Sequence, residues 1–292
     1  MAAVVEGILL IDKPSGPTSH DIVAAVRRLS GIRRVGHTGT LDPLATGLLA
    51  ICVGRATRLA EYMSGHRKSY ETTIRLGQET TTYDAEGEIV VERQVSVSEE
   101  EIATALEAFR GEITQVPPLY SAVKIDGKPL YRLAREGVEI EPPARTVTIF
   151  ELDPVAWSEP LLELRLTSSS GTYVRSLAHD LGRELDCGGH VSALRRTAIG
   201  SFTVEEAASL EALDKENLPE HLLPNESAVG HLPRLSLTRD DAINLYHGRT
   251  IARRADQPEA SLVSAFDSEG QFVGILKPAE AFWRAHKIFY QI

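Results

Sequence analysis

The sequence is poor in cysteine, with only Cys52 and Cys187 among 292 residues. Two cysteines are too few for a disulfide framework, so a reducing cytoplasm is the simplest expected location. No apolar run approaches the roughly 20 residues that a membrane-spanning helix needs. The chain opens Met-Ala-Ala-Val-Val-Glu and so lacks the basic segment that begins a signal peptide. These absences predict a protein with neither a membrane span nor a secretion signal.

Several common catalytic signatures are also missing. There is no Gly-Lys-Ser/Thr ending of a phosphate-binding loop and no Gly-x-Gly-x-x-Gly fingerprint after a strand. There is no Gly-x-Ser-x-Gly nucleophile elbow either. His179, Cys187 and His190 are metal ligands by type, but their spacing matches no complete four-ligand pattern. We therefore expect no metal site.

The chain also lacks the excess of basic charge that is typical of nucleic-acid-binding proteins, because its formal net charge is −10. The distribution is uneven. Residues 1–70 hold 9 Lys and Arg against 5 Asp and Glu, which leaves 22 basic and 36 acidic residues for the rest. Screening confines electrostatic effects to about 10 Å at ordinary salt, so a locally basic surface can still bind phosphates. The net charge argues only weakly against an RNA partner.

What the sequence does contain is a lone acid, Asp42, in a loop rich in Gly and Thr. The apolar run Leu48–Val53 follows and is typical of a buried strand, which places Asp42 at the lip of that strand. An acid there is a candidate nucleophile or general base, although the second acid of a paired-carboxylate hydrolase is absent. An Asp before Pro is also a common turn cap. From this loop alone, the two interpretations are equally well supported.

Periodicity predicts strands and helices that alternate irregularly, which favours an α+β fold with a mixed, mostly antiparallel sheet. Strands are expected at 7–12, 48–53, 68–76, 161–167 and 190–202, and helices at 19–31, 56–63, 98–109 and 173–185. Thr203–Glu206 is a further capping-box signature of a helix start. The proline-containing stretch 219–233 is expected to be a linker. A helix at 239–247 and short strands near 261–265, 271–276 and 287–291 predict a small β-rich appendage.

Residues 117–145 differ in character from the rest of the chain. They are rich in Pro and Gly, and between these residues stand four basic side chains: Lys124, Lys128, Arg132 and Arg135. We interpret this segment as an exposed arm with one short helix.

Other candidate residues mean little one by one. A lone histidine such as His37 is more often a surface or structural residue than a catalytic one. Tyr70 and Tyr173 could simply pack in the core or at its rim, and Arg175 could be a solvent-exposed charge on a helix. A buried arginine beside Asp42 would have a specific use, because it would keep the carboxylate ionised and oriented.

Six segments together resemble, in order, the motifs of the TruB family of pseudouridine synthases. They are Asp12–Ser19, Gly36–Gly47, Lys68–Gly77, Pro117–Lys124, Ser170–Leu177 and His190–Arg196. The resemblance runs through residues 7–200, about two thirds of the chain. Ser170 stands where many relatives have Lys, which removes one local positive charge.

The resemblance implies a pseudouridine synthase fold at 1–231, with an RNA-binding arm at about 117–145, and a small PUA-like domain at 232–292. The implied activity is isomerisation of uridine 55 in the T-loop of tRNA, by a monomer that needs no guide RNA and no cofactor. Asp42 would be the catalytic carboxylate and Arg175 its counter-charge. Tyr70 would stack on the flipped base and serve in proton transfer. The other implied binding residues are His37, against T-loop bases, Tyr173 and Leu194, at the base pocket, and the four basic arm residues, at phosphates.

Three alternatives remain open at this point. A guide-RNA-dependent synthase of the dyskerin type would share the catalytic motif, although the Pro-rich arm favours the stand-alone tRNA enzyme. A non-catalytic RNA chaperone would bind tRNA without needing both Asp42 and Arg175. A small-molecule enzyme would not bind tRNA in a salt-dependent way.

Overall fold

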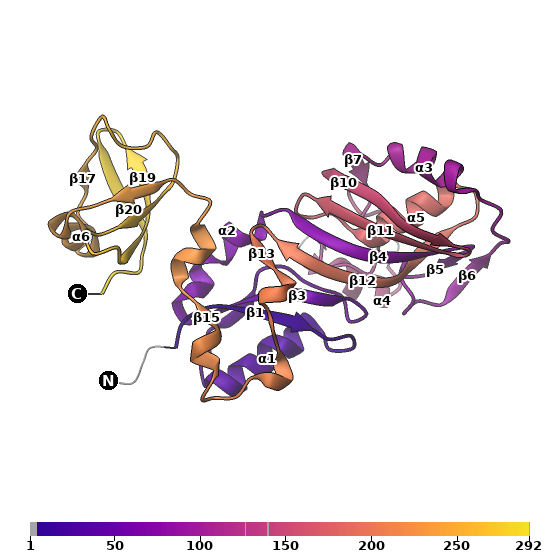
Figure 1. The fold of residues 1–292 in the computed structure, drawn as a ribbon, viewed down its shortest axis with the longest axis horizontal. Coiled ribbons are helices and arrows are strands. Elements are labelled where there is room, and N and C mark those ends of the chain that lie inside the picture. The colour runs from indigo at the N-terminus through magenta and orange to yellow at the C-terminus, as the bar shows by residue number, and fades with distance from the viewer. Residues whose placement is uncertain (1–4, 126, 139, 292) are drawn as a thin grey trace.

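The computed structural model describes residues 5–125, 127–138 and 140–291, so Asp126 and Glu139 of the expected arm lie outside the described residues. The described residues form a long mixed sheet and a separate five-stranded sheet, each covered by helices (Figure 1). No helix in these ranges combines the length and the apolar character needed to cross a membrane.

The long sheet has the strand order β14-β1-β3-β12-β4-β11-β10-β7, with β2, β13 and β15 paired at its side. Its central strands are β1 (Gly7–Lys13), β3 (Thr46–Val53), β4 (Lys68–Leu76), β10 (Arg145–Ser158), β11 (Leu161–Ser168) and β12 (Gly189–Ile199). The shorter ones are β2 (Val35–His37), β7 (Gly111–Gln115), β13 (Phe202–Thr203), β14 (Ala208–Ser209) and β15 (Leu222–Leu223). Neighbours are antiparallel except for β1 with β14 and β3 with β12, which confirms the expected mixed, mostly antiparallel α+β sheet.

Successive side chains of a strand point to opposite faces of the sheet. In the long sheet, apolar side chains pack on both faces. Leu9 and Ile11 of β1 pack under the helices α1 (Ser19–Ser30), α3 (Glu99–Glu107) and α5 (Val174–Glu184). Ile8 and Leu10 join a second cluster with the short helix α2 (Ala60–Ser64) and the C-terminal sheet. The continuous apolar runs of the sequence are therefore strands buried on both sides.

The predicted capping signals form at all three expected places. Thr18 caps α1 and Gly31 ends it in the left-handed conformation, while Ser98 forms a capping box at α3. The third signal, Thr203–Glu206, also forms its capping box, and it starts the single 3-10 turn η2 (Val204–Glu206). The helix goes no further because Ala207 is extended and the next residues pair as β14 beside β1. The helix expected at 56–63 is split into η1 (Gly54–Leu59) and α2.

The expected linker at 219–233 is folded as part of the unit around the long sheet. It contains the 3-10 turns η4 (Leu218–His221) and η5 (Asn225–Val229), and β15 between them pairs with β1. Ala228 and Val229 are fully buried. The prediction of a linker was wrong because the apolar residues between the prolines pack against the sheet.

The C-terminal part forms the small β-rich domain that the sequence predicts. It consists of α6 (Arg239–Tyr246), β16 (Arg234–Ser236), β17 (Ile251–Ala252), β18 (Val263–Phe266), β19 (Phe272–Ala279) and β20 (Phe282–Ile288). The last strand was expected near 287–291 but ends at Ile288. The expected range extended too far because Phe289 and Tyr290, just beyond the strand, are also buried apolar residues.

This domain packs against η1 and α2, which belong to the unit around the long sheet. Phe272 and Phe289 share an apolar cluster with Met63 of α2. Arg58 donates to the carbonyl of Ile288 at 2.9 Å, and its guanidinium lies over the Phe289 ring. With the expected domain boundary between residues 231 and 232, this contact is an interface between the two domains. The boundary itself stays a proposal.

Candidate active site

Asp42 lies in the loop between β2 and β3, and this loop is fixed from several sides. The hydroxyl of Ser19 accepts from the N–H of Leu41 at 2.8 Å and donates to its carbonyl at 2.9 Å. The buried Lys13 ammonium donates to the Pro43 carbonyl at 3.2 Å. The loop therefore has the rigid backbone that a preorganised site requires.

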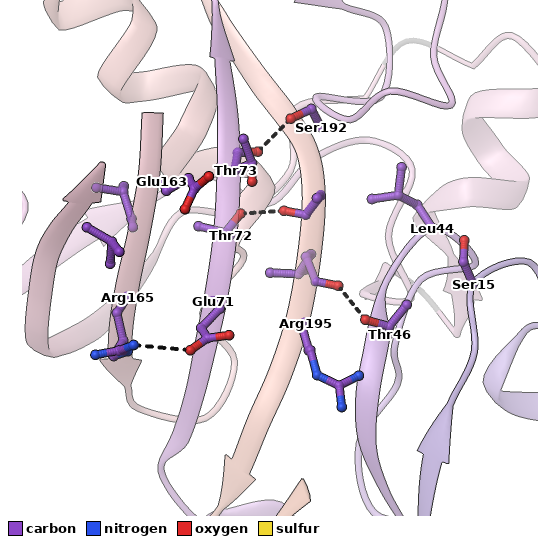
Figure 2. A pocket seen from close by; sticks show the side chains of 14 residues that line it. Ser15, Leu44, Thr46, Glu71, Thr72, Thr73, Glu163, Arg165, Ser192 and Arg195 are labelled. Atoms are coloured by element: carbon purple, nitrogen blue, oxygen red, sulfur yellow. Dashed lines mark hydrogen bonds and ion pairs between the residues drawn. The ribbon is translucent and has the colours of Figure 1, made fainter. Parts of the chain in front are cut away.

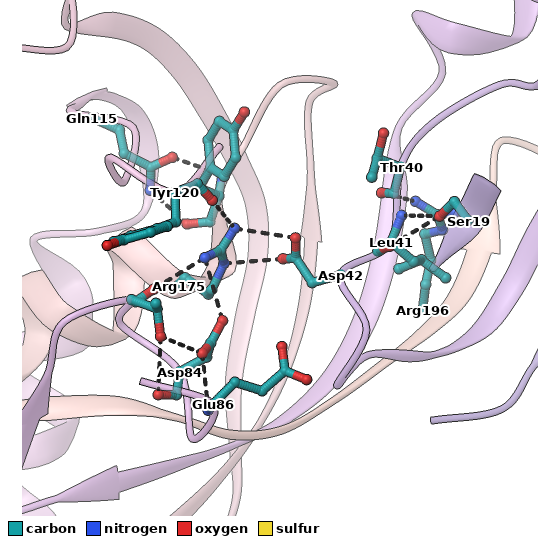
Figure 3. A network of polar contacts seen from close by, with 12 residues as sticks. Ser19, Thr40, Leu41, Asp42, Asp84, Glu86, Gln115, Tyr120, Arg175 and Arg196 are labelled. Carbon is teal, nitrogen blue, oxygen red and sulfur yellow. Dashed lines mark hydrogen bonds and ion pairs between the residues drawn. The ribbon is translucent and has the colours of Figure 1, made fainter. Parts of the chain in front are cut away.

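The Asp42 carboxylate faces Arg175 at the start of α5 (Figure 3). The Nε–Oδ2 distance is 3.0 Å and the Nη2–Oδ1 distance is 3.2 Å, which is a two-point ion pair. The Arg175 side chain is 6% exposed and that of Asp42 is 35% exposed. The acid is thus held by a buried cation while one side of it stays open, which a simple turn cap does not require.

Three further groups hold Arg175, and they come from two other segments (Figure 3). The guanidinium donates to the carbonyls of Thr82 and Tyr120 at 3.0 Å each. Its Nη1 also lies 3.3 Å from a carboxylate oxygen of Asp84, which is 4% exposed. Tyr120 belongs to the base of the arm, so one arginine joins the Asp42 loop, the arm and the turn that carries Asp84.

Sequence reasoning missed Asp84. It follows β5 (Gln78–Thr80), in the turn that leads to β6 (Ile89–Glu92). The Thr82 hydroxyl donates to Asp84 at 2.5 Å, and the N–H of Glu86 donates to the same oxygen at 3.1 Å. The only sequence signal was a polar stretch of Thr, Asp and Gly, which looks like an ordinary turn. Asp84 becomes a site candidate only through its contact with Arg175.

The surroundings of Asp42 act on its pKa in opposite directions. Burial raises the pKa of the Asp42 carboxyl and is the largest effect, while the Arg175 charge lowers it. The nearby Asp84 charge raises the pKa of Asp42 again, and Lys13 lowers it. The net direction is upward from the ordinary aspartate value, so Arg175 limits how far the acid shifts.

Asp42 and Arg175 open into a cavity of about 320 Å³ that also contains three of the other predicted residues. Tyr70 comes from β4, Leu194 from β12, and Tyr173 from the residue that precedes α5. The Gln115 amide holds the Tyr173 backbone, accepting from its N–H at 2.7 Å and donating to its carbonyl at 2.9 Å. A cavity with one paired acid, two tyrosines and a leucine suits a flat, partly apolar ring.

His37 stands apart from this cavity and is not among the residues that line it. It ends β2, and its ring lies edge-on to that of His20, with centroids 5.6 Å apart. Its Nδ1 is buried without a hydrogen-bond partner among the described residues. Burial lowers the pKa of His37, and the His20 and Arg196 charges lower it further, so the neutral ring is favoured.

Two buried cations of this cavity were not assigned a role from the sequence. Lys68 donates to the carbonyls of Ser64 and His66 at 2.8 Å each, and burial lowers the pKa of Lys68 to about 8. Arg196 is 1% exposed and donates to backbone carbonyls of the Asp42 loop. Both lie within the recognised motif segments, but only the structure shows that they enter the cavity.

A second, larger hollow of about 580 Å³ lies along β4, β11 and β12 (Figure 2). Several of its charged and polar side chains already have partners: Arg165 lies 3.3 Å from Glu71, and Ser192 donates to the Thr73 carbonyl at 3.0 Å. Leu194 lines both hollows. Because its internal ion pair, between Arg165 and Glu71, is exposed to solvent, this hollow is a weaker candidate for chemistry than the cavity at Asp42.

The arm carries its four basic residues on the surface. Lys124 lies on β8 (Lys124–Ile125), Lys128 on β9 (Lys128–Pro129), and Arg132 and Arg135 on α4 (Leu130–Arg135). All four are exposed, and none forms an ion pair within the described ranges. Such unpaired charges are suited to phosphate groups. The described residues include no cluster of three or more His, Cys, Asp or Glu side chains that could hold a metal ion.

Comparison with known proteins agrees with this arrangement. Residues 27–174 match the N-terminal domain of TruB family pseudouridylate synthases, and residues 175–230 match the tRNA pseudouridylate synthase B C-terminal domain. The chain is 48% identical to a tRNA pseudouridine synthase B of Aromatoleum aromaticum, over 93% of this chain and 88% of that protein. It is 45% identical to one of Dehalococcoides mccartyi, over 98% and 97% of the two chains.

Among solved structures, a Cbf5-Nop10-Gar1 complex contains a chain of similar fold, with a TM-score of 0.75 and 26% identity. The similarity covers 97% of this chain and 85% of that chain, so it includes the C-terminal domain. The domain matches, the high identity over nearly the whole length and the shared fold lead to one conclusion. The chain belongs to the TruB family of pseudouridylate synthases.

Proposed function

We propose that this enzyme is a monomeric tRNA pseudouridine synthase that isomerises uridine 55 in the T-loop, with Asp42 as the catalytic carboxylate. The observation that carries the proposal is the pair of Asp42 and Arg175 at a cavity lined by Tyr70, Tyr173 and Leu194. Relatives named tRNA pseudouridine synthase B support tRNA as the substrate.

The reaction requires one well-placed acid. The N1–C1′ bond of uridine breaks, the base turns, and C5 joins C1′, while the C5 proton is lost and N1 gains one. Since the product is an isomer, no redox partner is needed. A carboxylate stabilises an electron-poor sugar in glycoside chemistry, and we assign that role to Asp42. Arg175 keeps the acid ionised as the site closes around the base.

The other cavity residues suit the base. A uridine in a structured loop must be flipped out to reach Asp42, and unstacking it costs a few kcal/mol. Stacking on the ring of Tyr70 offsets part of that cost, since base–aromatic stacking is worth about 1–3 kcal/mol. Tyr173 and Leu194 wall the pocket on its other sides. Tyr70 lines the cavity, and we also assign its hydroxyl a role in proton transfer.

We assign His37 and the arm to RNA binding outside the cavity. The neutral ring of His37 can stack against bases of the opened loop. Lys124, Lys128, Arg132 and Arg135 contact phosphates, which sets affinity and its salt dependence more than specificity.

Replacing Arg132 and Arg135 together with Ala should weaken tRNA binding and make it less sensitive to salt. Each phosphate that is no longer neutralised lowers the slope of log Kd against log salt by roughly 0.7–0.9. The turnover rate at saturating RNA should stay within about threefold, because these residues do not touch the reacting base. Binding titrations between low and moderate salt measure the slope.

The control is the double variant Arg110→Ala and Arg165→Ala. These surface arginines already pair with Asp153 and Glu71, so their loss should leave the slope unchanged. An unchanged slope in the arm variant as well would remove the arm from the RNA interface.

The proposed function is tested with purified protein and a bare T-stem-loop RNA, without guide RNA or protein partners. Conversion of the target uridine supports a stand-alone tRNA enzyme. Binding without conversion would instead favour an RNA chaperone, and conversion only after a guide RNA is added would favour the dyskerin type.

A further inference from the structure

Strand β12 carries two adjacent arginines in opposite environments. Arg195 faces the outer side of the sheet and forms a two-point pair with Asp12, at 2.7 and 2.9 Å. Arg196 points inward and is 1% exposed. An arginine has five N–H donors and cannot lose its charge, so a buried one requires several acceptors.

The acceptors of Arg196 lie on both sides of Asp42 along the chain. Its Nη2 donates to the Gly39 carbonyl at 3.1 Å and its Nη1 to the Thr40 carbonyl at 3.3 Å. Its Nε donates to the Leu48 carbonyl at 2.8 Å. Figure 3 shows Arg196 beside Thr40 and Leu41, at the end of the loop opposite the Arg175 pair. One guanidinium therefore bridges the start and the end of the catalytic loop.

The close approach of two strands makes this bridge possible. Arg196 stands opposite Gly47 in the parallel pairing of β12 with β3. A Cβ on Gly47 would lie 2.3 Å from the Arg196 carbonyl oxygen, which is a steric clash. Gly47 also has φ +96°, a backbone conformation that favours glycine. The strand that follows Asp42 can thus run directly against the arginine.

Arg196 also reaches Tyr70. The two residues are register partners in the antiparallel pairing of β12 with β4, and both line the cavity at Asp42. Both side chains therefore enter one cavity from adjacent strands, with the guanidinium near the Tyr70 side chain. Because arginine only donates, a hydrogen bond between the two would use the Tyr70 oxygen as acceptor and would turn the hydroxyl proton away from the guanidinium.

We propose that Arg196 is a positioning residue that holds the Asp42 loop and the Tyr70 hydroxyl in one frame. The carboxylate is then aimed at the sugar while the hydroxyl proton is aimed at the base. This inference rests on the proposed function, since it concerns how the same cavity orders its two reactive side chains. A displacement of about 1 Å in such a frame costs roughly 100-fold in rate.

The test is a double-mutant cycle on single-turnover conversion of a T-stem-loop RNA at saturating enzyme. Arg196→Gln and Arg196→Lys are made alone and with Tyr70→Phe, and Arg195→Gln is the matched control on the same strand. Arg196→Gln should slow conversion about 100-fold, with RNA affinity within about threefold of wild type. Arg196→Lys keeps the buried charge and should recover part of the rate, while Arg195→Gln should stay near wild type.

The coupling decides between positioning and mere support of the fold. In the Tyr70→Phe background, the factor by which Arg196→Gln lowers the conversion rate should be at least about tenfold smaller than in wild type. The proposal would be overturned if the rate factors of the two single variants multiply to give that of the double variant. An Arg196→Gln enzyme as fast as Arg195→Gln would overturn it as well. Inactivity of the wild-type enzyme itself would instead refute the proposed function.

If the Arg196 variants do not fold, the stability of Tyr70→Phe tests the proposal without them. If the Tyr70 hydroxyl accepts from the buried guanidinium, as the proposal requires, its removal should lower the thermal midpoint, whereas Tyr131→Phe on the arm should not. A Tyr70→Phe protein as stable as wild type would show that the hydroxyl does not bind Arg196.

Discussion

Asp42→Asn is expected to abolish conversion of uridine while leaving folding and tRNA binding intact. Asn has the shape of Asp without the charge, so it cannot stabilise an electron-poor sugar. Loss of an essential catalytic group of this kind lowers the rate by about 10⁴-fold or more. Single-turnover assays on a T-stem-loop RNA measure the rate, and a binding titration measures the affinity, which should change less than about threefold.

The matched control is Asp12→Asn. Asp12 is 33% exposed against 35% for Asp42, and it also forms a two-point pair with an arginine. It does not line the cavity at Asp42. The control variant should retain activity within about tenfold. If Asp42→Asn turns over no more slowly than Asp12→Asn, the assignment of the catalytic acid is wrong.

Arg175→Met should also remove turnover, but it should cost stability as well. The substitution leaves the Asp42 and Asp84 carboxylates without the cation that both approach, and breaking a buried pair typically costs about 3–5 kcal/mol. The expected results are a lowered thermal midpoint and a rate at least about 100-fold below wild type. Thermal unfolding and single-turnover kinetics measure the two effects.

A second substitution separates stability from chemistry. Adding Asp84→Asn to Arg175→Met removes one of the two uncompensated charges, so the midpoint should recover in part. Turnover should not recover, because Asp42 still lacks its counter-charge. Recovery of turnover together with stability would mean that Arg175 acts only by supporting the fold.

The pH dependence of any remaining activity gives an independent check on the pair. Conversion requires ionised Asp42, so it is lost as pH falls through the pKa of that acid. Burial raises this pKa and Arg175 lowers it. Without Arg175 the acid limb of the kcat/KM profile should move to higher pH. A limb at the wild-type position in Arg175→Met would show that the arginine does not act on the carboxylate.

Much of the fold could be predicted because its strands are strongly patterned. The alternation along Lys68–Leu76 gave β4 with its bounds as observed, and Gly31 marked the end of α1. The capping box at Thr203 forms as predicted, but it starts only one 3-10 turn because the residues after it pair beside β1, which no local pattern reports. The sequence alone also gave no sign that residues 219–233 pack into the sheet, since their burial depends on strands far away in the chain.

The site was predicted unevenly for a similar reason. Asp42 and Arg175 lie 133 positions apart, and only the resemblance to a family joined them. Asp84 and Arg196 have no local pattern that distinguishes a turn acid or a strand arginine from a buried site residue. Their significance lies in distances between β12, the Asp42 loop and the turn after β5, which are properties of the folded chain.

The most direct test of the central claim is nucleotide-resolution mapping of pseudouridine on unmodified tRNA incubated with the purified protein alone. We predict pseudouridine at position 55 with the wild-type enzyme, and none there with Asp42→Asn. Conversion at position 55 by the Asp42→Asn protein, or a wild-type enzyme that leaves this position as uridine, would contradict the account.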